Sequence, residues 1–381
     1  MPPDPDRLRR EFLSRTGRQA AGVWSAPGRV NLIGEHTDYN QGFVLPIAID
    51  ARTFVAAAPR SDGVLRGWSL QETQGFEVPV DRLAPGAIQG WGSYACGPVW
   101  VLSREGRAVS GADFLLDSNV PLGAGLSSSA ALQVAVALAF SDMSGEPLSG
   151  TELAMVAHRS ESEFVGVPVG TMDQMISALG RRNAALFLDA RDGSFDYVPF
   201  EPSTAGLSLV VIDTGASHSL REGQYAERRA TCEAAAVALG LRSLREATLD
   251  QVSAGGLSEV EEKRARHVVT ENDRVLEVVA ELKKGSFRQV GSAFVRSHQS
   301  LRDLYEVSSP ELDLAVESAL KSGALGARMT GGGFGGSAIA LLDTGMVPSL
   351  TDAVEAAFAG AGFGEPRVFP VTAEQGATSH R

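Results

Sequence analysis

The sequence of 381 residues lacks the features that mark several large classes of protein. Its two cysteines, Cys96 and Cys232, are too few for a disulfide framework or a cysteine zinc site, so we expect reduced, buried thiols. No apolar run reaches about 18 residues, so we expect no membrane-spanning helix. The first residues lack the basic and apolar regions of a secretory signal peptide. We therefore expect a cytoplasmic protein.

Positive charge is also scarce. Lys and Arg total 34 against 46 Asp and Glu, which gives a formal net charge of −12. Such a surface repels nucleic-acid phosphates and anionic lipids, so we expect neither nucleic acid nor a membrane as a partner. The remaining composition, 44% hydrophobic and 21% charged, is that of an ordinary globular protein and excludes a disordered chain or a coiled-coil rod.

The order of the expected elements is mixed. Strands and helices share the chain up to about residue 180, a block of helices follows, and strands return near the end. That order predicts an α+β fold of two domains, residues 1–180 and 181–381. Residues 27–42 are rich in turn formers and charges, so we expect a loop there. The other expected elements are strands at 23–26, 43–49, 53–58, 64–80, 184–189, 207–213, 338–342 and 367–371, and helices at 7–18, 91–104, 127–143, 151–165, 218–240, 257–284, 286–303, 310–322 and 348–361, with a further helix from about 171.

Glycine is abundant, with 42 residues, and the segment 121–131 (PLGAGLSSSAA) is the most informative cluster. Glycine turns allow successive backbone N–H groups to point at one centre, and the N-terminus of the following helix adds a partial positive charge. The segment therefore suits a phosphate group, or else it is a serine-capped helix after a glycine turn. It is not a Walker A loop, because no Gly-Lys-Ser/Thr occurs, and Ser128 replaces the third glycine of a dinucleotide motif.

Two further segments combine glycine with polar residues. Residues 26–42 place carboxylates, an imidazole and Arg29 in one short stretch. Such a set can accept from and donate to several hydroxyls of a sugar, or it is a solvated loop with a buried Arg–Asp pair. Residues 328–337 contain five glycines in six positions, which excludes a regular helix or strand interior. That loop allows the backbone to approach either a ligand or the other glycine loop.

Two carboxylates stand out elsewhere. Asp173 falls in the first turn of a helix if Thr171 is its N-cap, and the helix dipole there favours the ionised form. The alternative is that Asp173 only helps to cap the helix. Glu161 lies on a partly apolar helix face and needs a partner, either a metal ion or an arginine.

Taken in order, the three glycine-bearing segments resemble the three motifs of the GHMP small-molecule kinases. The first, GRVNLIGEHTDYNQGFVLP, closely resembles the motif of the galactokinases within that family. GTMDQMISALG resembles the segment that carries their catalytic aspartate, and GQYAERRATCE the segment of a sugar-contacting tyrosine. The resemblance implies a two-domain GHMP-kinase-like fold with the active site in the cleft between the domains. It also allows the last strand to return to the N-terminal domain.

The resemblance implies a role for each matching residue. Asp173 and Arg29 would be catalytic, and Ser129 and Glu161 would bind Mg²⁺. The expected sugar-binding residues are Glu35, His36, Thr37, Asp38, Gly170 and Tyr225. The expected nucleotide-binding residues are Ser69, Trp91, Tyr94, Gly123, Ala124, Gly125, Leu126, Ser127, Ser128 and Ser129.

The implied activity is ATP-dependent phosphorylation of galactose at its anomeric hydroxyl, giving galactose 1-phosphate and ADP. This is the first committed step of galactose use by the Leloir pathway, and we expect a monomer to carry it out. Asp173 would act either as an early general base or as an electrostatic anchor. The alternatives are a kinase for another sugar, such as arabinose or N-acetylgalactosamine, and a non-catalytic galactose and ATP sensor of the same fold. The intact phosphate loop and Asp173 argue against the sensor.

Overall fold

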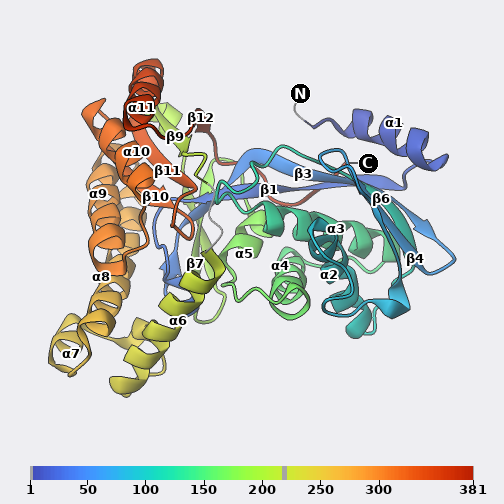
Figure 1. Cartoon of the computed structure of the whole chain (residues 1–381), viewed down its shortest axis with the longest axis horizontal. Helices are drawn as coiled ribbons and strands as arrows, with labels where there is room; N and C mark the ends of the chain where they lie inside the picture. The colour runs from blue at the N-terminus through green and yellow to red at the C-terminus, as the bar shows by residue number, and fades with distance from the viewer. Residues whose placement is uncertain (1–2, 217–220, 381) are drawn as a thin grey trace.

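The computed structural model describes residues 3–216 and 221–380, and its strands form three sheets. A six-stranded sheet with its helices occupies the right of Figure 1, and a four-stranded sheet with its helices occupies the left. The six-stranded sheet has the order β13-β1-β3-β6-β4-β5 and is antiparallel except between β4 and β6. Its strands are β1 (Gly22–Asn31), β3 (Pro46–Arg60), β4 (Val64–Ser69), β5 (Phe76–Pro79), β6 (Gly111–Ser118) and β13 (Thr378–His380).

Alternate side chains of a strand point to opposite faces of a sheet. In this sheet, helices cover both faces. On the outer face, helix α1 (Pro5–Thr16) packs Leu8 and Phe12 against Val23 and Phe54. On the inner face, Trp24 and its neighbours in the sheet pack against four helices. These helices are α2 (Trp91–Arg104), α3 (Ser128–Ser144), α4 (Gly150–Arg159) and α5 (Met172–Leu179).

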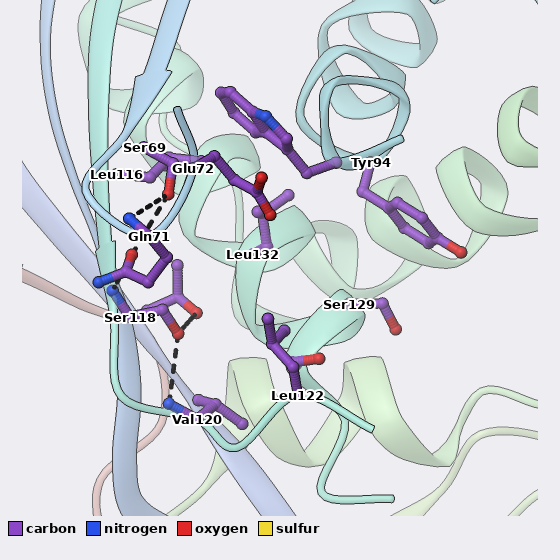
Figure 2. Close-up of a pocket in the computed structure, with 13 residues that line it drawn as sticks. Ser69, Gln71, Glu72, Tyr94, Leu116, Ser118, Val120, Leu122, Ser129 and Leu132 are labelled. Carbon is purple, nitrogen blue, oxygen red and sulfur yellow. Dashed lines mark hydrogen bonds between the residues drawn. The ribbon is translucent and has the colours of Figure 1, made fainter. Parts of the chain in front are cut away.

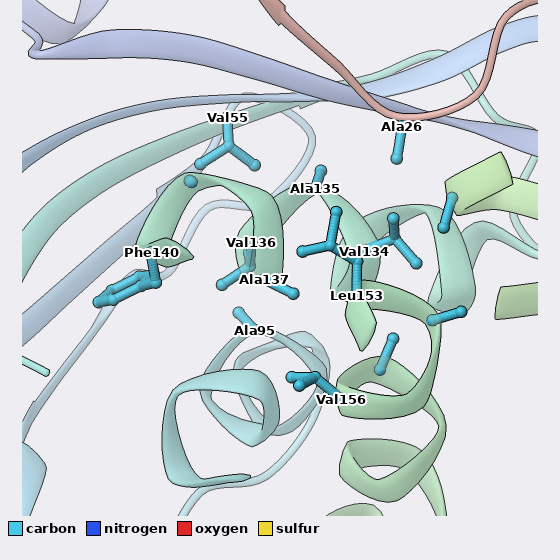
Figure 3. Close-up of a cluster of buried hydrophobic side chains, with 14 of the residues drawn as sticks. Ala26, Val55, Ala95, Val134, Ala135, Val136, Ala137, Phe140, Leu153 and Val156 are labelled. Carbon is cyan, nitrogen blue, oxygen red and sulfur yellow. The ribbon is translucent and has the colours of Figure 1, made fainter. Parts of the chain in front are cut away.

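Helix α3 lies at the centre of this layer. Figure 3 shows it between Val55 of the sheet above and Ala95 of α2 and Val156 of α4 below. Its residues from Val134 to Ala137 are all buried, because sheet and helices surround it. An all-round apolar helix is typical of such a position. This packing fixes the position of the first residues of α3, which directly follow the glycine segment 121–127.

The C-terminal half contains the four-stranded antiparallel sheet β10-β11-β9-β12 and most of the remaining helices. A three-stranded sheet, β2-β7-β8, joins residues from both halves of the chain. One buried cluster also spans the halves, with Ile47 of β3, Val211 of β9 and Phe294 of α9 among its members. The elements are β2 (Phe43–Val44), β7 (Ala184–Asp189), β8 (Phe195–Pro199), β9 (Leu207–Asp213), β10 (Gly326–Thr330), β11 (Ser337–Asp343), β12 (Arg367–Val371), α6 (Arg221–Ala238), α7 (Leu249–Ala254), α8 (Glu259–Lys283), α9 (Val290–Ser300), α10 (Pro310–Lys321) and α11 (Val347–Ala361).

After β12 the chain crosses back to the six-stranded sheet, where β13 pairs with β1. Arg52 of β3 holds this returning segment, since its Nη1 donates to Gln375 O at 2.6 Å and its Nη2 to Gly376 O at 2.7 Å. The backbone of Gly376 also donates to Gly180 O, just beyond α5, at 2.7 Å. The segment just before the last strand therefore ties together the sheet and the helix that carries Asp173.

The structure confirms most of the expected elements and corrects several. Residues 27–31 are not loop but the end of β1, which continues past a bulge between Pro27 and Arg29. The strand expected at 367–371 forms as β12 and stays in the C-terminal sheet, where it pairs with β9. The helix expected at 286–303 is α9, and a π-helical turn from Leu301 to Tyr305 follows it. Four strands, β6, β8, β10 and β13, and helix α7 were not expected.

Three other expectations concern single features of the chain. The helix expected at 218–240 is described from Arg221, and residues 218–220 lie outside the described ranges. Both cysteines are free and buried, as expected. Across residues 3–216 and 221–380, none of the helices has the length and apolar character needed to cross a bilayer.

Candidate active site

A cavity of about 120 Å³ lies between the two halves of the chain, and we call it the sugar-side cavity. Its walls come from the 26–42 segment, the residues around the start of α5, helix α6 and the glycine loop after β10. The lining residues are Arg29, Glu35, His36, Asp38, Val169, Gly170, Met172, Asp173, Tyr225, Gly331 and Gly332. Seven of them were predicted from the sequence, so segments that are far apart along the chain do meet here.

Arg29 and Asp173, the two residues predicted to be catalytic, are in contact. Arg29 projects from the end of β1, and its Nε and Nη2 donate to Asp173 Oδ1 and Oδ2, both at 2.9 Å. The hydroxyl of Ser127 also donates to Asp173 Oδ2. Arg29 Nη1 donates to Gly125 O at 2.6 Å, which fixes the guanidinium to the phosphate-loop segment. Asp173 lies in the first turn of α5, as expected, but Thr171 before it makes no side-chain capping bond.

Asp38 lies opposite Gly170 across the cavity wall. A Cβ atom on Gly170 would lie 1.7 Å from Asp38 Oδ2, so any other residue there requires the carboxylate or the loop to move. Asp38 Oδ1 accepts a hydrogen bond from the backbone of Tyr39 at 2.9 Å. Burial raises the pKa of the Asp38 carboxyl to about 6, and the nearby Asp173 charge adds to this.

Glu35 is held by an arginine that the sequence analysis did not single out. Arg328 of β10 is fully buried, and its Nη2 lies 2.5 Å from Glu35 Oε2 and 3.6 Å from Glu271 Oε1. Glu35 Oε1 accepts from the backbone of Gly331 at 3.0 Å. Burial raises the pKa of Glu35, and Arg328 opposes this shift. Burial acts on Glu271 in the same sense, but Arg274 and Arg328 outweigh it and lower its pKa to about 2.

His36 and Thr37 behave differently although they are neighbours. His36 has a φ of +63° and lines the cavity, and burial lowers the pKa of its imidazole to about 3, so the ring is neutral. Thr37 does not line the cavity. Its hydroxyl lies 2.7 Å from Gly34 O and 2.6 Å from Phe43 O, so its side chain stabilises the loop.

The expected phosphate loop joins this cavity to a second one. Gly123, Gly125 and Ser127 all have a positive φ, and α3 begins directly after them at Ser128. Residues 123–127 line neither cavity, but Ser127 contacts Asp173 and Ser128 lines the second cavity. The third glycine segment crosses this loop, since Ser337 Oγ donates to Ala124 O at 2.8 Å. It also contributes Gly331 and Gly332 to the wall of the sugar-side cavity. The predicted crossing of the two glycine loops is confirmed, and contact of this loop with a ligand stays a prediction.

The second cavity, which we call the nucleotide-side cavity, has a volume of about 290 Å³. Figure 2 shows Tyr94 of α2 and Ser129 and Leu132 of α3 on one side, and Ser69 and Ser118 of two sheet strands on the other. Among its lining residues, Ser69, Trp91, Tyr94, Ser128 and Ser129 were predicted from the sequence. The others are Thr53, Gln71, Glu72, Leu116, Ser118, Val120, Leu122 and Leu132.

Glu161 lies behind Ser129, in a π-helical turn from Ser160 to Val165. Its Oε2 accepts from Gln133 at 3.0 Å and from Gln174 at 2.7 Å, and within the described ranges no arginine or lysine pairs with it. Burial raises the pKa of Glu161, and a hydrogen bond with Ser129 opposes the shift. The described residues contain no cluster of three or more His, Cys, Asp or Glu side chains that could hold a metal. Glu161 and Ser129 are thus one carboxylate and one hydroxyl facing each other.

Comparison with known proteins decides the family. A family model described as the galactokinase galactose-binding signature matches residues 10–59. Models of the GHMP kinase N-terminal domain and C-terminal region match residues 93–181 and 278–361. A galactokinase of Streptomyces coelicolor is 50% identical to this chain and aligns over 96% of each sequence. The chain belongs to the galactokinase family.

Solved structures agree with this family. The structure of Lactococcus lactis galactokinase complexed with galactose superposes with a TM-score of 0.93 at 31% identity, covering 98% of this chain and 99% of that one. The mevalonate kinase of Methanococcus jannaschii is 17% identical with a TM-score of 0.67, covering 93% of this chain and 98% of that one, and it shows the shared fold alone. As a member of the galactokinase family the chain is a kinase, with ATP as its co-substrate.

Proposed function

We propose that the chain transfers the γ-phosphate of ATP to the anomeric hydroxyl of galactose, giving galactose 1-phosphate and ADP. One observation carries the proposal: Asp173, held by Arg29 and Ser127, lies in the wall of a sugar-sized cavity beside the phosphate loop. Relatives at 42–50% identity bear the galactokinase name, which favours neither a kinase for another sugar nor a sensor.

Within this proposal, galactose binds in the sugar-side cavity. Acceptors and donors converge there from Glu35, His36, Asp38 and Tyr225, and Gly170 leaves room for the Asp38 carboxylate. This mixture suits a ligand that presents several hydroxyls, each both donor and acceptor.

Asp173 orients the attacking hydroxyl and accepts its proton. A carboxylate has about four acceptor positions, and Arg29 and Ser127 fill three of them. The remaining position is left for the substrate hydroxyl, which donates to the carboxylate. Arg29 also offsets negative charge on the phosphoryl group during transfer, since charge stabilisation and positioning dominate this chemistry.

ATP occupies the nucleotide-side cavity. Its phosphates lie at residues 123–129, where the N-terminus of α3 supplies unpaired N–H groups. Ser127 of the same loop contacts Asp173 in the wall of the sugar-side cavity, so the γ-phosphate and the anomeric hydroxyl meet at Asp173. Trp91 and Tyr94 contribute aromatic rings, and Ser69 a hydroxyl, to the lining of this cavity.

Ser129 and Glu161 fit a magnesium ion. Mg²⁺ prefers oxygen ligands and usually takes only one or two from the protein, together with phosphates and water. Glu161 is a buried carboxylate that no described cationic side chain neutralises, and Ser129 lies between it and the nucleotide-side cavity. When bound, the ion neutralises charge on the phosphates.

The proposal is tested by Asp173→Asn, which keeps the shape but removes the charge and the proton acceptor. We expect kcat to fall by at least ~10²-fold, while the variant stays folded and still binds galactose in calorimetry. Asp189→Asn is the matched control. Asp189 is also half-buried and paired with a mostly buried arginine, Arg245, but it lies outside both cavities. A folded Asp173→Asn variant with more than about a tenth of the wild-type kcat, a barrier change below ~1.4 kcal/mol, would contradict the catalytic role.

A further inference from the structure

A chain of hydrogen bonds runs from the sugar-side cavity into the interior of the C-terminal half. His36 Nδ1 lies 2.8 Å from the hydroxyl of Tyr39, which lies 2.8 Å from the hydroxyl of Tyr305. The chain ends at Cys232, whose Sγ lies 3.0 Å from the Tyr305 hydroxyl. Neither tyrosine lines the cavity, so neither belongs to the set that would touch the sugar.

The other ring nitrogen of His36 has no such partner. Nε2 is buried and has no partner of full hydrogen-bond geometry among the described residues, although a backbone contact with Gly332 of the cavity wall raises the pKa of the ring. A buried polar atom without a partner is costly in a folded protein. Because His36 lines the sugar-side cavity, a bound sugar can supply the missing partner.

Aromatic contacts fix the orientation of the ring. The His36 ring lies 4.7 Å from the ring of Tyr305 and 5.7 Å from that of Tyr225, measured between centroids. Tyr39 meets Tyr225 edge to face at 5.2 Å. The imidazole is therefore held on several sides, and the remaining freedom is which of its nitrogens carries the proton.

The chemistry of the chain favours one direction for its protons. A neutral imidazole nitrogen is a strong acceptor and a phenol is a good donor, whereas a thiol sulfur is weak in both roles. If the protons point toward His36, the strongest bond, from the Tyr39 hydroxyl to Nδ1, is formed. If they point toward Cys232, the chain ends in a weak bond to sulfur. Hydrogen bonds that all point the same way also strengthen one another.

We propose that Tyr39 and Tyr305 are positioning residues that fix His36 as the Nε2–H tautomer, so that His36 donates to one oxygen of the bound sugar. The inference rests on the proposed function, since it takes galactose as the occupant of the sugar-side cavity. Recognition of that sugar oxygen by His36 then depends on two tyrosines that do not line the cavity.

The first test measures the tautomer directly. The protein has six histidines, and long-range proton–nitrogen correlation spectra of ¹⁵N-histidine-labelled protein report which nitrogen of each is protonated. The His36 signals are assigned by their loss in His36→Gln. We expect the Nε2–H form in the wild type without any ligand, and a mixture of both tautomers in Tyr39→Phe.

Tyr197→Phe is the matched control for this test. The Tyr197 hydroxyl also donates a hydrogen bond, to Leu179 O at 2.7 Å, but it lies outside the sugar-side cavity. It should leave the His36 signals unchanged. Tyr305→Phe should give an intermediate result, because Tyr39 then keeps its bond to Nδ1 but loses the hydroxyl that orders its proton.

The second test measures binding of galactose and its analogues by calorimetry. We expect Tyr39→Phe to weaken galactose binding by roughly threefold to tenfold, with the KM for ATP unchanged. A panel of singly deoxygenated and singly fluorinated galactoses then isolates the donor role of His36, because fluorine can accept a hydrogen bond but cannot donate one. At the position facing His36, the wild type should bind the fluoro sugar more tightly than the deoxy sugar. In Tyr39→Phe this difference should disappear.

The outcomes separate the inference from the proposed function. If the wild type binds no galactose, the proposed function fails, and the tautomer spectra still decide the inference. If the wild type binds galactose, and Tyr39→Phe melts normally with the same tautomer and affinity, the inference alone is wrong. A lower melting temperature with an unchanged tautomer and an unchanged fluoro-to-deoxy ratio would show that the tyrosines only support the fold, which also overturns it.

Discussion

Gly170 shows how strongly the proposed sugar site depends on a single missing side chain. A methyl group there would overlap Asp38 Oδ2, at a distance of 1.7 Å, so the loop or the carboxylate must move. We expect Gly170→Ala to raise the KM for galactose by ~10-fold or more, since one contributor to the cavity wall is displaced. The KM for ATP should stay within twofold. Gly360→Ala is the control, because a Cβ at that position meets no atom within 4 Å.

The pKa of Asp38 predicts a pH dependence of galactose binding. Burial raises this pKa from 3.8 to about 6, so the fold favours the protonated acid, and its contribution to stability decreases as the pH rises through about 6. The effect on binding has the opposite sign, because the ionised carboxylate is the better acceptor for sugar hydroxyls. Galactose affinity should therefore fall roughly tenfold between pH 7 and pH 5. Calorimetry without nucleotide avoids titration of ATP, and Asp38→Asn should give a flat profile. A wild-type profile as flat as that of the variant would contradict the role of Asp38.

At the scale of elements, the π-helical turn from Ser160 to Val165 positions Glu161. Such turns often occur at functional sites, because the extra residue redirects the side chains that follow. Helix α2 approaches this turn closely, since a Cβ on Gly97 would lie 2.0 Å from Ser160 Oγ. Glu161 is thereby turned inward toward α3, while Glu163 in the same turn is exposed and paired with Arg159.

This arrangement predicts which substitutions change the magnesium requirement. Glu161→Gln should raise the Mg²⁺ concentration for half-maximal activity more than Ser129→Ala does, because a charged ligand binds a hard cation more strongly. Glu163→Gln should leave the Mg²⁺ titration unchanged. Identical titrations in all three variants would instead indicate that Glu161 and Ser129 serve only packing and capping.

Most elements could be predicted from the sequence, and those that could not have physical reasons. Strand β6 is buried at seven consecutive positions, so it lacks the polar and apolar alternation of a half-exposed strand. Strand β13 has only three residues, and its position depends entirely on pairing with β1. Residues 27–31 contain proline and glycine, which usually end a strand, and the bulge in β1 accommodates them.

The proposed site was partly predictable for a related reason. Residues within a recognisable motif, such as Asp173 and Arg29, could be named before their contact was known. The importance of Arg328 could not, because an arginine is expected at the surface. Only the fold brings it to Glu35 and Glu271, which lie in separate parts of the chain.

At the scale of the whole molecule, Arg52 joins the C-terminal segment to the six-stranded sheet. Arg52→Ala removes two short hydrogen bonds to backbone carbonyls, together worth about 1–3 kcal/mol, so we expect the melting temperature to fall by roughly 1–4 °C. Arg66→Ala is the control. Arg66 lies on the same sheet, but its pair with Glu77 is exposed at both ends, so its loss should shift the melting temperature by about 1 °C or less. Equal shifts in the two variants would mean that the attachment of the last strand contributes little to stability.

The pairing of β13 with β1 also means that this edge of the six-stranded sheet can form only after β13 has been synthesised. Strand β1 leaves the ribosome long before its outer neighbour, which lies at residues 378–380. Until then the N–H and C=O groups along that edge of β1 have no strand to pair with, and such an edge can recruit other chains. A newly made chain therefore carries an unpaired strand edge while the residues between β1 and β13 are synthesised. Chaperones that cover strand edges should matter most for this protein during that interval.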